Sequence, residues 1–238
     1  MTPRDRLIIA LDVDTADKAL RLVGQLKGAV RFFKIGLELF SACGPGIVEQ
    51  VKATGCEVFL DLKFHDIPTT VAKAAVSVTK LGAYMFNVHA LGGYDMMRKA
   101  AEAVRAEAAR LARPAPKVIA VTVLTSMDEK ALKMTGINAI MNDEVAALAR
   151  LAKEAALDGV VASPQETRMI RALLGPDFLI VTPGVRPAWA GSDDQKRIAT
   201  PAEAVAAGAS FIVVGRPVTA AQDPAEAARR IIEEIEKI

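Results

Sequence analysis

Short apolar runs alternate with amphipathic, Ala-rich stretches eight times along this chain of 238 residues. The runs with the length of strands are 7–13, 31–37, 57–64, 84–90, 117–124, 159–162, 178–182 and 211–215. The stretches with helical periodicity are roughly 15–27, 45–54, 67–81, 94–111, 143–157, 164–174, 201–207 and 224–237. Eight β-α units without a long linker predict one α/β domain over residues 1–238, a closed (β/α)8 TIM barrel.

Helix-start signals support this alternation. Pro164, Pro201 and Pro224 each follow a Ser, Thr or Asp, and proline is favoured at the first helical position after such a cap. Asp143, followed by Glu144, is expected to cap the fifth helix in the same way. An open doubly wound sheet is the alternative, but no G-x-G-x-x-G turn follows the first strand.

The composition limits the kinds of partner. Hydrophobic residues make up 52% of the chain, enough for one large core, and 30 basic and 28 acidic residues give a net charge of +2. No basic run indicates a nucleic-acid or membrane surface, although a locally basic pocket would suit an anionic small molecule. Cys43 and Cys56 have no motif spacing, and no segment resembles a signal peptide or a membrane span. We expect a cytoplasmic protein with no nucleic-acid or membrane partner.

The third strand ends in a dense group of charges. Asp61, Lys63 and Asp66 follow the apolar run 58–60 directly. Residues i and i+2 of a strand share a face, so Asp61 and Lys63 point the same way and Leu62 points the other. Charged side chains are rarely buried without partners, so this face is typical of a functional site.

Other polar residues stand at the C-terminal ends of the predicted strands, where active sites of this fold lie. The full set is Asp12, Lys34, Asp61, Lys63, Asp66, Asn87, His89, Thr125, Ser126 and Arg216. By the two-residue period, Lys34 lies opposite Phe33 and Ile35 and points into the barrel mouth. These charges could merely pair and stabilise the barrel, but buried ion pairs contribute little net stability. We therefore interpret the carboxylates and lysines as a reactive centre.

The loops after the seventh and eighth strands carry a phosphate-binding pattern, Pro183-Gly184-Val185-Arg186 and Val214-Gly215-Arg216-Pro217. In such barrels these loops often hold a phosphate, because glycine lets backbone N–H groups approach and arginine binds oxyanions bidentately. Arg186 and Arg216 could instead be solvated surface residues. The polar stretch 186–199 is expected to form a lid that closes over the phosphate.

Other chemistries find little support in the sequence. His65 and His89 are the only 2 histidines, and neither has a second ligand at metal-like spacing. Ser163 precedes a proline and is better interpreted as a helix cap than as a nucleophile. No P-loop, G-x-S-x-G elbow or cofactor motif occurs. We expect neither a metal nor a cofactor.

The segment Asp61-x-Lys63-x-x-Asp66-Ile67-Pro68-x-Thr70 resembles the signature of the orotidine 5′-monophosphate decarboxylase family. Further segments match in the family's order and extend the resemblance over essentially the whole chain: 10–12, 33–36, 123–126, 182–187, 194–195 and 214–217. Sugar-phosphate decarboxylases and aldolases of the same superfamily share the D-x-K-x-x-D core. The Ile-Pro-x-Thr extension and the Gly-Arg-Pro after the eighth strand narrow the resemblance to the one family.

The resemblance implies a carboxy-lyase that converts orotidine 5′-monophosphate to UMP and CO2, the last step of de novo pyrimidine nucleotide synthesis. The implied catalytic residues are Lys34, Asp61, Lys63 and Asp66. The implied substrate-binding residues are Asp12, Lys34, Ile67, Thr70, Thr125, Pro183, Arg186, Gln195, Gly215 and Arg216. The resemblance also implies a homodimer in which Asp66, Ile67 and Thr70 reach into the site of the neighbouring subunit.

Lys63 is implied to protonate C6 of the pyrimidine ring. Loss of CO2 from this carbon leaves a carbanion without an electron sink, and the sequence has no cofactor motif that would supply one. An ammonium flanked by carboxylates is a suitable acid, since nearby opposite charge favours its charged form. It can stabilise the developing negative charge and then donate its proton.

Two alternatives remain at this point. A Mg2+-dependent decarboxylase or aldolase that acts on a keto-sugar phosphate would share the barrel, the phosphate loops and the D-x-K-x-x-D core. A non-catalytic module could bind nucleotide phosphates without turnover. Loss of activity on addition of a chelator would identify the first alternative. The second would be identified if substitution of Lys63 changed no reaction of the protein.

Overall fold

The structure, a computed structural model, describes residues 1–190 and 199–238. Eight parallel strands form a closed barrel in chain order, with β1 also paired to β8. The strands are β1 (Leu7–Ala10), β2 (Phe32–Gly36), β3 (Glu57–Phe64), β4 (Met85–His89), β5 (Lys117–Val121), β6 (Gly159–Val161), β7 (Leu179–Thr182) and β8 (Phe211–Val214). The predicted (β/α)8 barrel is confirmed.

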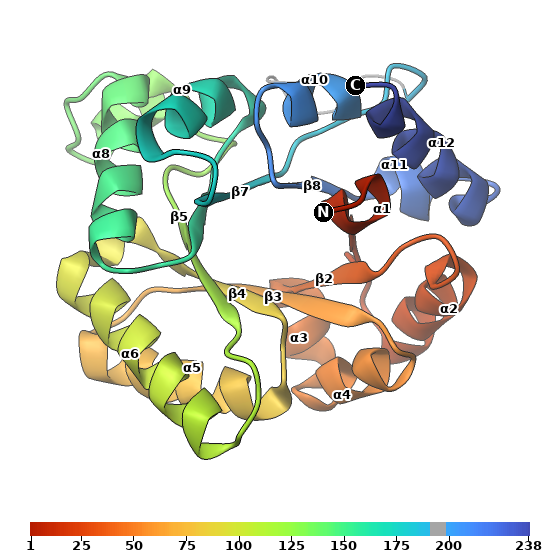
Figure 1. Cartoon of the computed structure of the whole chain (residues 1–238), viewed down its shortest axis with the longest axis horizontal. Helices are drawn as coiled ribbons and strands as arrows, with labels where there is room; N and C mark the ends of the chain where they lie inside the picture. Colours follow the sequence, from red (N-terminus) through yellow and green to blue (C-terminus); the bar gives the residue numbers. More distant parts are fainter. Residues whose placement is uncertain (191–198) are drawn as a thin grey trace.

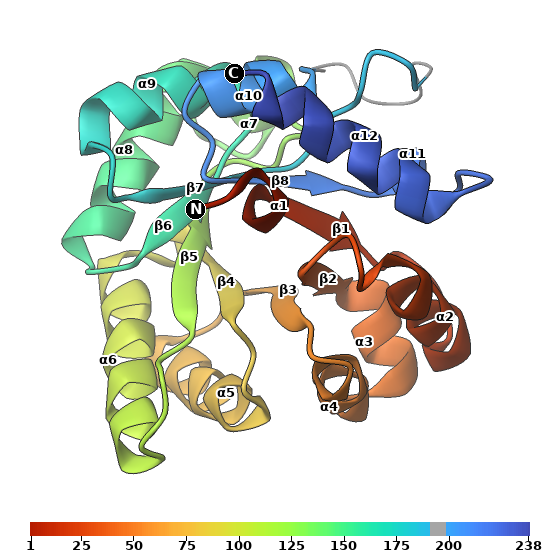
Figure 2. The same cartoon turned by 45° about the vertical axis from the view of Figure 1, so that its right-hand side comes forward.

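Helices surround the strands on all sides (Figures 1 and 2). The longer ones are α2 (Ala16–Leu26), α4 (Gly46–Ala53), α5 (Pro68–Leu81), α6 (Tyr94–Arg110), α8 (Met141–Glu154), α9 (Pro164–Leu174) and α12 (Pro224–Glu236). The shorter ones are α1 (Pro3–Arg6), α3 (Leu37–Cys43), η1 (Ala90–Gly92), α7 (Glu129–Met134), α10 (Pro201–Ala206) and α11 (Arg216–Thr219). Among the described residues, no helix combines the length and apolar character needed to cross a membrane.

The structure corrects several predicted boundaries. The sequence reading missed α1, α3, η1, α7 and α11, because helices of one or two turns are too short to show a 3.6-residue period. Leu37 begins α3 and does not end the second strand. Asp143 lies in the first turn of α8, whose N-cap is Ile140, so the predicted Asp143 cap was wrong. Pro164, Pro201 and Pro224 begin their helices as predicted.

The core has two layers, which follow from the two-residue period of the strands. One group of side chains fills the inside of the barrel: Ile8, Ala10, Phe32, Phe59, Met85, Ile119, Val181, Phe211 and Val213. The alternate residues pack against the helices, as Phe33 and Ile35 of β2 do. Lys34 therefore points inward with Phe32, as predicted.

The inner layer fills the barrel beneath the C-terminal ends of the strands. Phe32 and Phe211 meet edge to face with ring centroids 5.5 Å apart. Because these apolar side chains fill the interior, polar side chains near the strand ends face an open mouth above them. The site occupies that mouth.

Strand β3 has an irregularity where its charged residues begin. Leu60 pairs with Phe86 and Phe64 pairs with Val88, so residues 61–63 lie opposite Asn87 alone. Lys63 takes a positive φ of 52°, a conformation that a non-glycine residue rarely adopts. The bulge turns the Lys63 backbone out of the regular ladder.

Candidate active site

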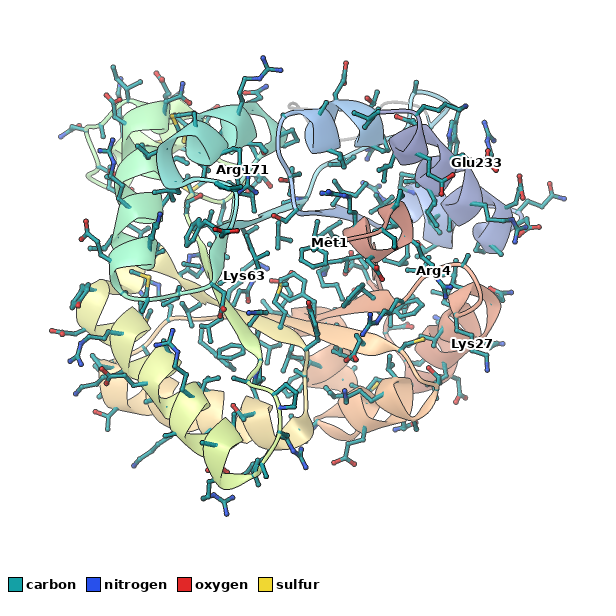
Figure 3. The ribbon with its side chains drawn as sticks, in the orientation of Figure 1. Met1, Arg4, Lys27, Lys63, Arg171 and Glu233 are labelled. Atoms are coloured by element: carbon teal, nitrogen blue, oxygen red, sulfur yellow. The ribbon has the colours of Figure 1, made fainter. Side chains whose placement is uncertain are left out.

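A cavity of about 320 Å3 opens at the C-terminal ends of the strands. The predicted residues that line it are Asp12, Lys34, Asp61, Lys63, Thr125, Pro183, Arg186, Gly215 and Arg216. They come from β2, β3 and the segments that follow β1, β5, β7 and β8, and the closed barrel brings them together. Figure 3 shows Lys63 inside the ring of helices, while Arg4, Lys27 and Glu233 lie among the surrounding helices.

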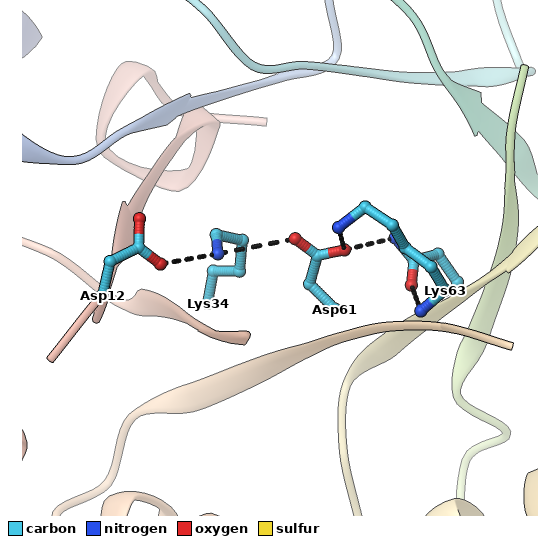
Figure 4. A network of polar contacts seen from close by, with 5 residues as sticks. Asp12, Lys34, Asp61 and Lys63 are labelled. Carbon is cyan, nitrogen blue, oxygen red and sulfur yellow. Dashed lines mark hydrogen bonds and ion pairs between the residues drawn. The ribbon is translucent and has the colours of Figure 1, made fainter. Parts of the chain in front are cut away.

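Charges alternate in sign across this cavity (Figure 4). The Lys34 Nζ lies 2.9 Å from Asp12 Oδ1 and 3.4 Å from Asp61 Oδ2. The Lys63 Nζ lies 2.7 Å from Asp61 Oδ1. Lys34 and Asp61 are largely withdrawn from solvent, with side-chain exposures of 12% and 13%. Each charge is thus held by an oppositely charged neighbour, as such burial requires.

Asp61 stays ionised in spite of its burial. Burial is the largest single influence on this carboxyl group and favours its neutral form. The charges of Lys34 and Lys63, together with hydrogen bonds from Lys63 and Asn87, outweigh that influence. The net result holds the pKa of the Asp61 carboxyl below its usual value.

Arginines stand at the opposite wall of the cavity from β3. Arg186 follows β7 and is buried, with 6% of its surface exposed. Its backbone N–H donates to the Ala199 carbonyl at 2.9 Å, so Ala199 lies beside the segment that follows β7. Gly215 and Arg216 follow β8, and a Cβ on Gly215 would lie 3.7 Å from Asp12 Oδ2. The guanidinium groups of Arg186 and Arg216 make this wall suitable for an anionic group.

Comparison with known proteins identifies the family. Residues 5–231 match the model of the orotidine 5′-phosphate decarboxylase / HUMPS family. The orotidine 5′-phosphate decarboxylase of Moorella thermoacetica is 55% identical over 100% of this chain and 95% of its own length. That of Syntrophomonas wolfei is 52% identical over all of both chains. The crystal structure of the enzyme from Lactobacillus acidophilus superposes with a TM-score of 0.85 at 38% identity, covering 97% of this chain and 99% of that one.

The chain belongs to the orotidine 5′-phosphate decarboxylase / HUMPS family. The resemblance drawn from the sequence is therefore confirmed. In this family member the segment Asp61-x-Lys63-x-x-Asp66 divides into two parts. Asp61 and Lys63 line the cavity, whereas Asp66 does not.

Asp66, Ile67 and Thr70 do not line the cavity of their own chain. Asp66 is exposed, and its Oδ1 accepts a hydrogen bond from the Ile67 N–H at 2.6 Å. The Ile67 side chain is 65% exposed, and Thr70 is exposed in the first turn of α5. The sequence assigned these three residues to the site of a neighbouring subunit, and that assignment stays a prediction.

Gln195 and the greater part of the predicted lid 186–199 fall outside the described residues. At its two ends, Val185 and Ala199 form a parallel bridge. The predicted roles of Gln195 and of the lid stay predictions.

The cavity is also lined by residues for which the sequence indicated no individual catalytic or substrate-binding role, although Asn87 was noted at a strand end and three others lie in the phosphate-loop pattern. They are Ala10, Phe59, Asn87, Val161, Val181, Gly184, Val185, Val213 and Pro217. Ala10, Phe59, Val181 and Val213 belong to the inner layer of the barrel and also line the cavity, and the two-residue period of the strands predicts that they point inward. Asn87 is different, because it stands at a predicted strand end but its partners lie on another strand. A sequence pattern along one strand does not contain that information.

His65 and His89 lie beside each other near the cluster, with ring centroids 5.4 Å apart. Burial, followed by the proximity of His65 and Lys63, lowers the pKa of His89. The part of the chain that the structure describes has no group of three or more potential ligands that could hold a metal ion. Neither histidine lines the cavity.

Proposed function

We propose that this chain decarboxylates orotidine 5′-monophosphate to UMP and CO2, the last step of de novo pyrimidine nucleotide synthesis. The observation that carries the proposal is the alternating chain Asp12, Lys34, Asp61 and Lys63 along a cavity whose other wall holds Arg186 and Arg216. Family membership and relatives with the decarboxylase name support the same reaction. They do not favour a Mg2+-dependent enzyme of keto-sugar phosphates.

The two walls of the cavity match the two ends of the substrate. Arg186, Gly215 and Arg216 bind the 5′-phosphate, because guanidinium groups and a glycine backbone suit an oxyanion. Asp12 and Lys34 bind the ribose hydroxyls between the phosphate and the charge cluster. Thr125 and Pro183 line the cavity and contact the pyrimidine ring. The orotate carboxylate then faces β3.

Lys63 performs the proton transfer. The bond between C6 and the carboxylate carbon breaks, CO2 leaves, and the electron pair remains on C6. The Lys63 Nζ donates one proton to C6, which gives UMP, and the lysine regains a proton from water. Two unit charges about 4 Å apart attract by about 4 kcal/mol at an effective dielectric constant near 20, which sets the scale of the stabilisation. This attraction accelerates the reaction because it strengthens as negative charge develops on C6.

Asp61 orients Lys63 and places a negative charge beside the substrate carboxylate. Its Oδ1 holds the Lys63 ammonium at 2.7 Å and its Oδ2 faces Lys34. Departure of neutral CO2 relieves the repulsion between the two carboxylates. The preorganised charges need no rearrangement during the reaction.

A homodimer completes each site in this proposal. Asp66, Ile67 and Thr70 reach the cavity of the second subunit and contribute a carboxylate, an apolar contact and a ribose contact. Their exposure in the single chain supports this role. Leu37, Leu91 and Tyr94 follow neighbouring strands and are also exposed, at 56%, 47% and 41%, which gives the same face of the barrel an apolar character.

The test is an assay of the purified chain with orotidine 5′-monophosphate in the presence of EDTA. Loss of the orotate absorbance with formation of UMP and CO2 is the expected result. No conversion of this substrate, together with Mg2+-dependent activity on a keto-sugar phosphate, would replace the proposal with the alternative from the same superfamily. Dialysis before the assay tests the expectation that no cofactor is needed.

A further inference from the structure

Asn87 is a buried amide on β4 that contacts both members of the Asp61–Lys63 pair. Only 1% of its surface is exposed. Its Nδ2 donates to Asp61 Oδ1 at 2.7 Å, and its Oδ1 accepts a hydrogen bond from the Lys63 backbone N–H at 2.8 Å. The side chain thus joins the carboxylate of one residue to the main chain of the other.

The contact with the Lys63 backbone replaces a bond that the bulge removes. Residues 61–63 lie opposite Asn87 alone, so the regular β3–β4 ladder is interrupted there. A backbone N–H that loses its strand partner needs another acceptor when it is withdrawn from water. The Asn87 carbonyl oxygen supplies it, and the left-handed conformation of Lys63, with φ 52°, persists because surrounding contacts hold it.

The contact with Asp61 fixes the direction of its carboxylate. Oδ1 accepts from both the Lys63 ammonium and the Asn87 amide, while Oδ2 faces Lys34. The amide must keep its orientation, since a flip would turn its oxygen toward the carboxylate and its NH2 toward the Lys63 N–H. One amide therefore orients the carboxylate and, through the backbone, the lysine that the carboxylate holds.

We propose that Asn87 is the positioning residue of the proton donor, which fixes the Asp61 carboxylate and the Lys63 backbone in the one arrangement that aims the Lys63 ammonium at C6. This inference rests on the proposed decarboxylation. Asn87 acts through Asp61 and Lys63, so its contribution belongs to the chemical step. The phosphate and ribose contacts lie on other strands, and binding of the nucleotide does not depend on it.

The first test compares Asn87→Leu with Thr79→Val. Leucine has a similar volume but neither donates nor accepts, so kcat is expected to fall about 10²-fold, the effect of a misplacement near 1 Å. KM changes less than threefold or so, because ground-state binding is retained. Thr79 is also buried, its hydroxyl donates to the Ala75 carbonyl within α5, and it does not line the cavity, so Thr79→Val is expected to retain the unsubstituted kcat.

Two controls separate positioning from folding. Circular dichroism and thermal unfolding show whether each variant is folded. Titration with UMP counts the functional sites, and kcat is expressed per UMP-binding site. If Asn87→Leu loses rate only in proportion to UMP-binding sites, the role is structural and the proposal is overturned.

The decisive variant is Asn87→Asp, because the introduced carboxyl group can mimic the amide in only one protonation state. The neutral acid donates to Asp61 and accepts from the Lys63 N–H, as the amide does. The ionised form cannot donate and places a second negative charge against Asp61. The kcat of Asn87→Asp, divided by that of the unsubstituted enzyme at the same pH, is therefore expected to rise at least tenfold or so from pH 8 to pH 5.5.

Other titrating groups surround this position, and their effects on kcat must cancel when the variant is divided by the unsubstituted enzyme. They are Asp61 and Lys63 on β3, Lys34 on β2, and His65 and His89 at the ends of β3 and β4; the β5 residues at this level, Ile119 and Ala120, are apolar. The same ratio for Asn87→Leu serves as the reference and is expected to stay flat. A flat ratio for Asn87→Asp as well would overturn the proposal. Failure of the decarboxylation itself would show in the unsubstituted enzyme and is thereby distinguished.

Discussion

Lys63 is held in position by one contact to its side chain and one to its backbone. Asp61 holds its ammonium at 2.7 Å, and Asn87 holds its backbone N–H at 2.8 Å. The side-chain contact could be predicted from the sequence, because Asp61 and Lys63 are two residues apart on one strand. The backbone contact could not, because the bulge and the Asn87 partner depend on how β4 packs beside β3.

Substitution of Arg216 tests the proposed phosphate-binding end of the site. Arg216→Ala is expected to raise KM at least tenfold or so and to lower kcat/KM with it, since an arginine–phosphate contact is among the stronger hydrogen bonds. Steady-state kinetics with orotidine 5′-monophosphate measure both constants. Arg229→Ala on the exposed side of α12 is the control and leaves them unchanged. Unaltered kinetics of Arg216→Ala would remove this residue from the phosphate site.

The burial of His89 is expected to make the free energy of unfolding depend on pH. Its pKa is lowered in the folded chain, mainly by burial and then by His65 and Lys63. Below the ordinary histidine pKa of about 6.5, the unfolded state binds more protons than the folded state, so the free energy of unfolding falls as pH falls. Urea unfolding of the unsubstituted chain and of His89→Gln at pH 7.5 and 5.5 measures this effect. A smaller loss in His89→Gln is expected, and an equal loss in both proteins would contradict it.

At the scale of elements, the strands follow from the sequence better than their ends do. The apolar runs place all eight strands, and the two-residue period separates inner residues such as Phe32 from outer ones such as Phe33. Short helices such as α3 and α11 escape prediction because four to seven residues provide too few repeats of a helical face. They matter to the site, since α11 begins at Arg216.

Arg171 of α9 joins that helix to the segments that lead into β7 and β8, at the opposite end of the barrel from the site. It donates to the Pro176 and Phe178 carbonyls at 2.9 and 2.7 Å and to the Gly208 carbonyl at 2.8 Å. Arg171→Met removes charged donors from several carbonyls at once and is expected to lower the free energy of unfolding by about 3 kcal/mol. Denaturant unfolding measures the change.

Arg229→Met, which breaks an exposed pair with Glu226 within α12, is the matched control and costs at most about 0.5 kcal/mol. The kcat and KM of both variants are expected to equal those of the unsubstituted chain at a temperature where both are folded. A cost for Arg171→Met no larger than that of the control would show that the carbonyls find other partners without loss.

At the scale of the whole molecule, the closed barrel explains why a site drawn from six parts of the sequence forms one cavity. Asp12 and Arg216 are far apart in the chain, but β1 pairs with β8 and brings their segments together. Asp66, Ile67 and Thr70 do not reach the cavity of their own chain. Their predicted role needs a second subunit, so it can be tested only on the assembled protein.

Mixed dimers provide that test. Lys63→Ala and Asp66→Ala are each expected to be nearly inactive. After dissociation and random reassociation of equal amounts, half of the dimers contain one subunit of each kind, and each such dimer has one intact site when Asp66 acts across a two-fold interface. The mixture should regain about one quarter of the unsubstituted activity. No recovery, with mixed dimers shown to be present, would place Asp66 in its own subunit's site or outside both.

The most direct test of the account measures turnover by the unsubstituted chain and by Lys63→Ala side by side. Both are incubated with orotidine 5′-monophosphate and EDTA, and the loss of orotate absorbance is followed together with the UMP formed. The account predicts rapid conversion by the unsubstituted chain, and a folded, UMP-binding Lys63→Ala variant whose turnover is lower by at least about 10⁴-fold, the upper range of general acid catalysis. Substantial turnover by Lys63→Ala would contradict the role of Lys63 as proton donor, and no turnover by the unsubstituted chain would contradict the proposed reaction.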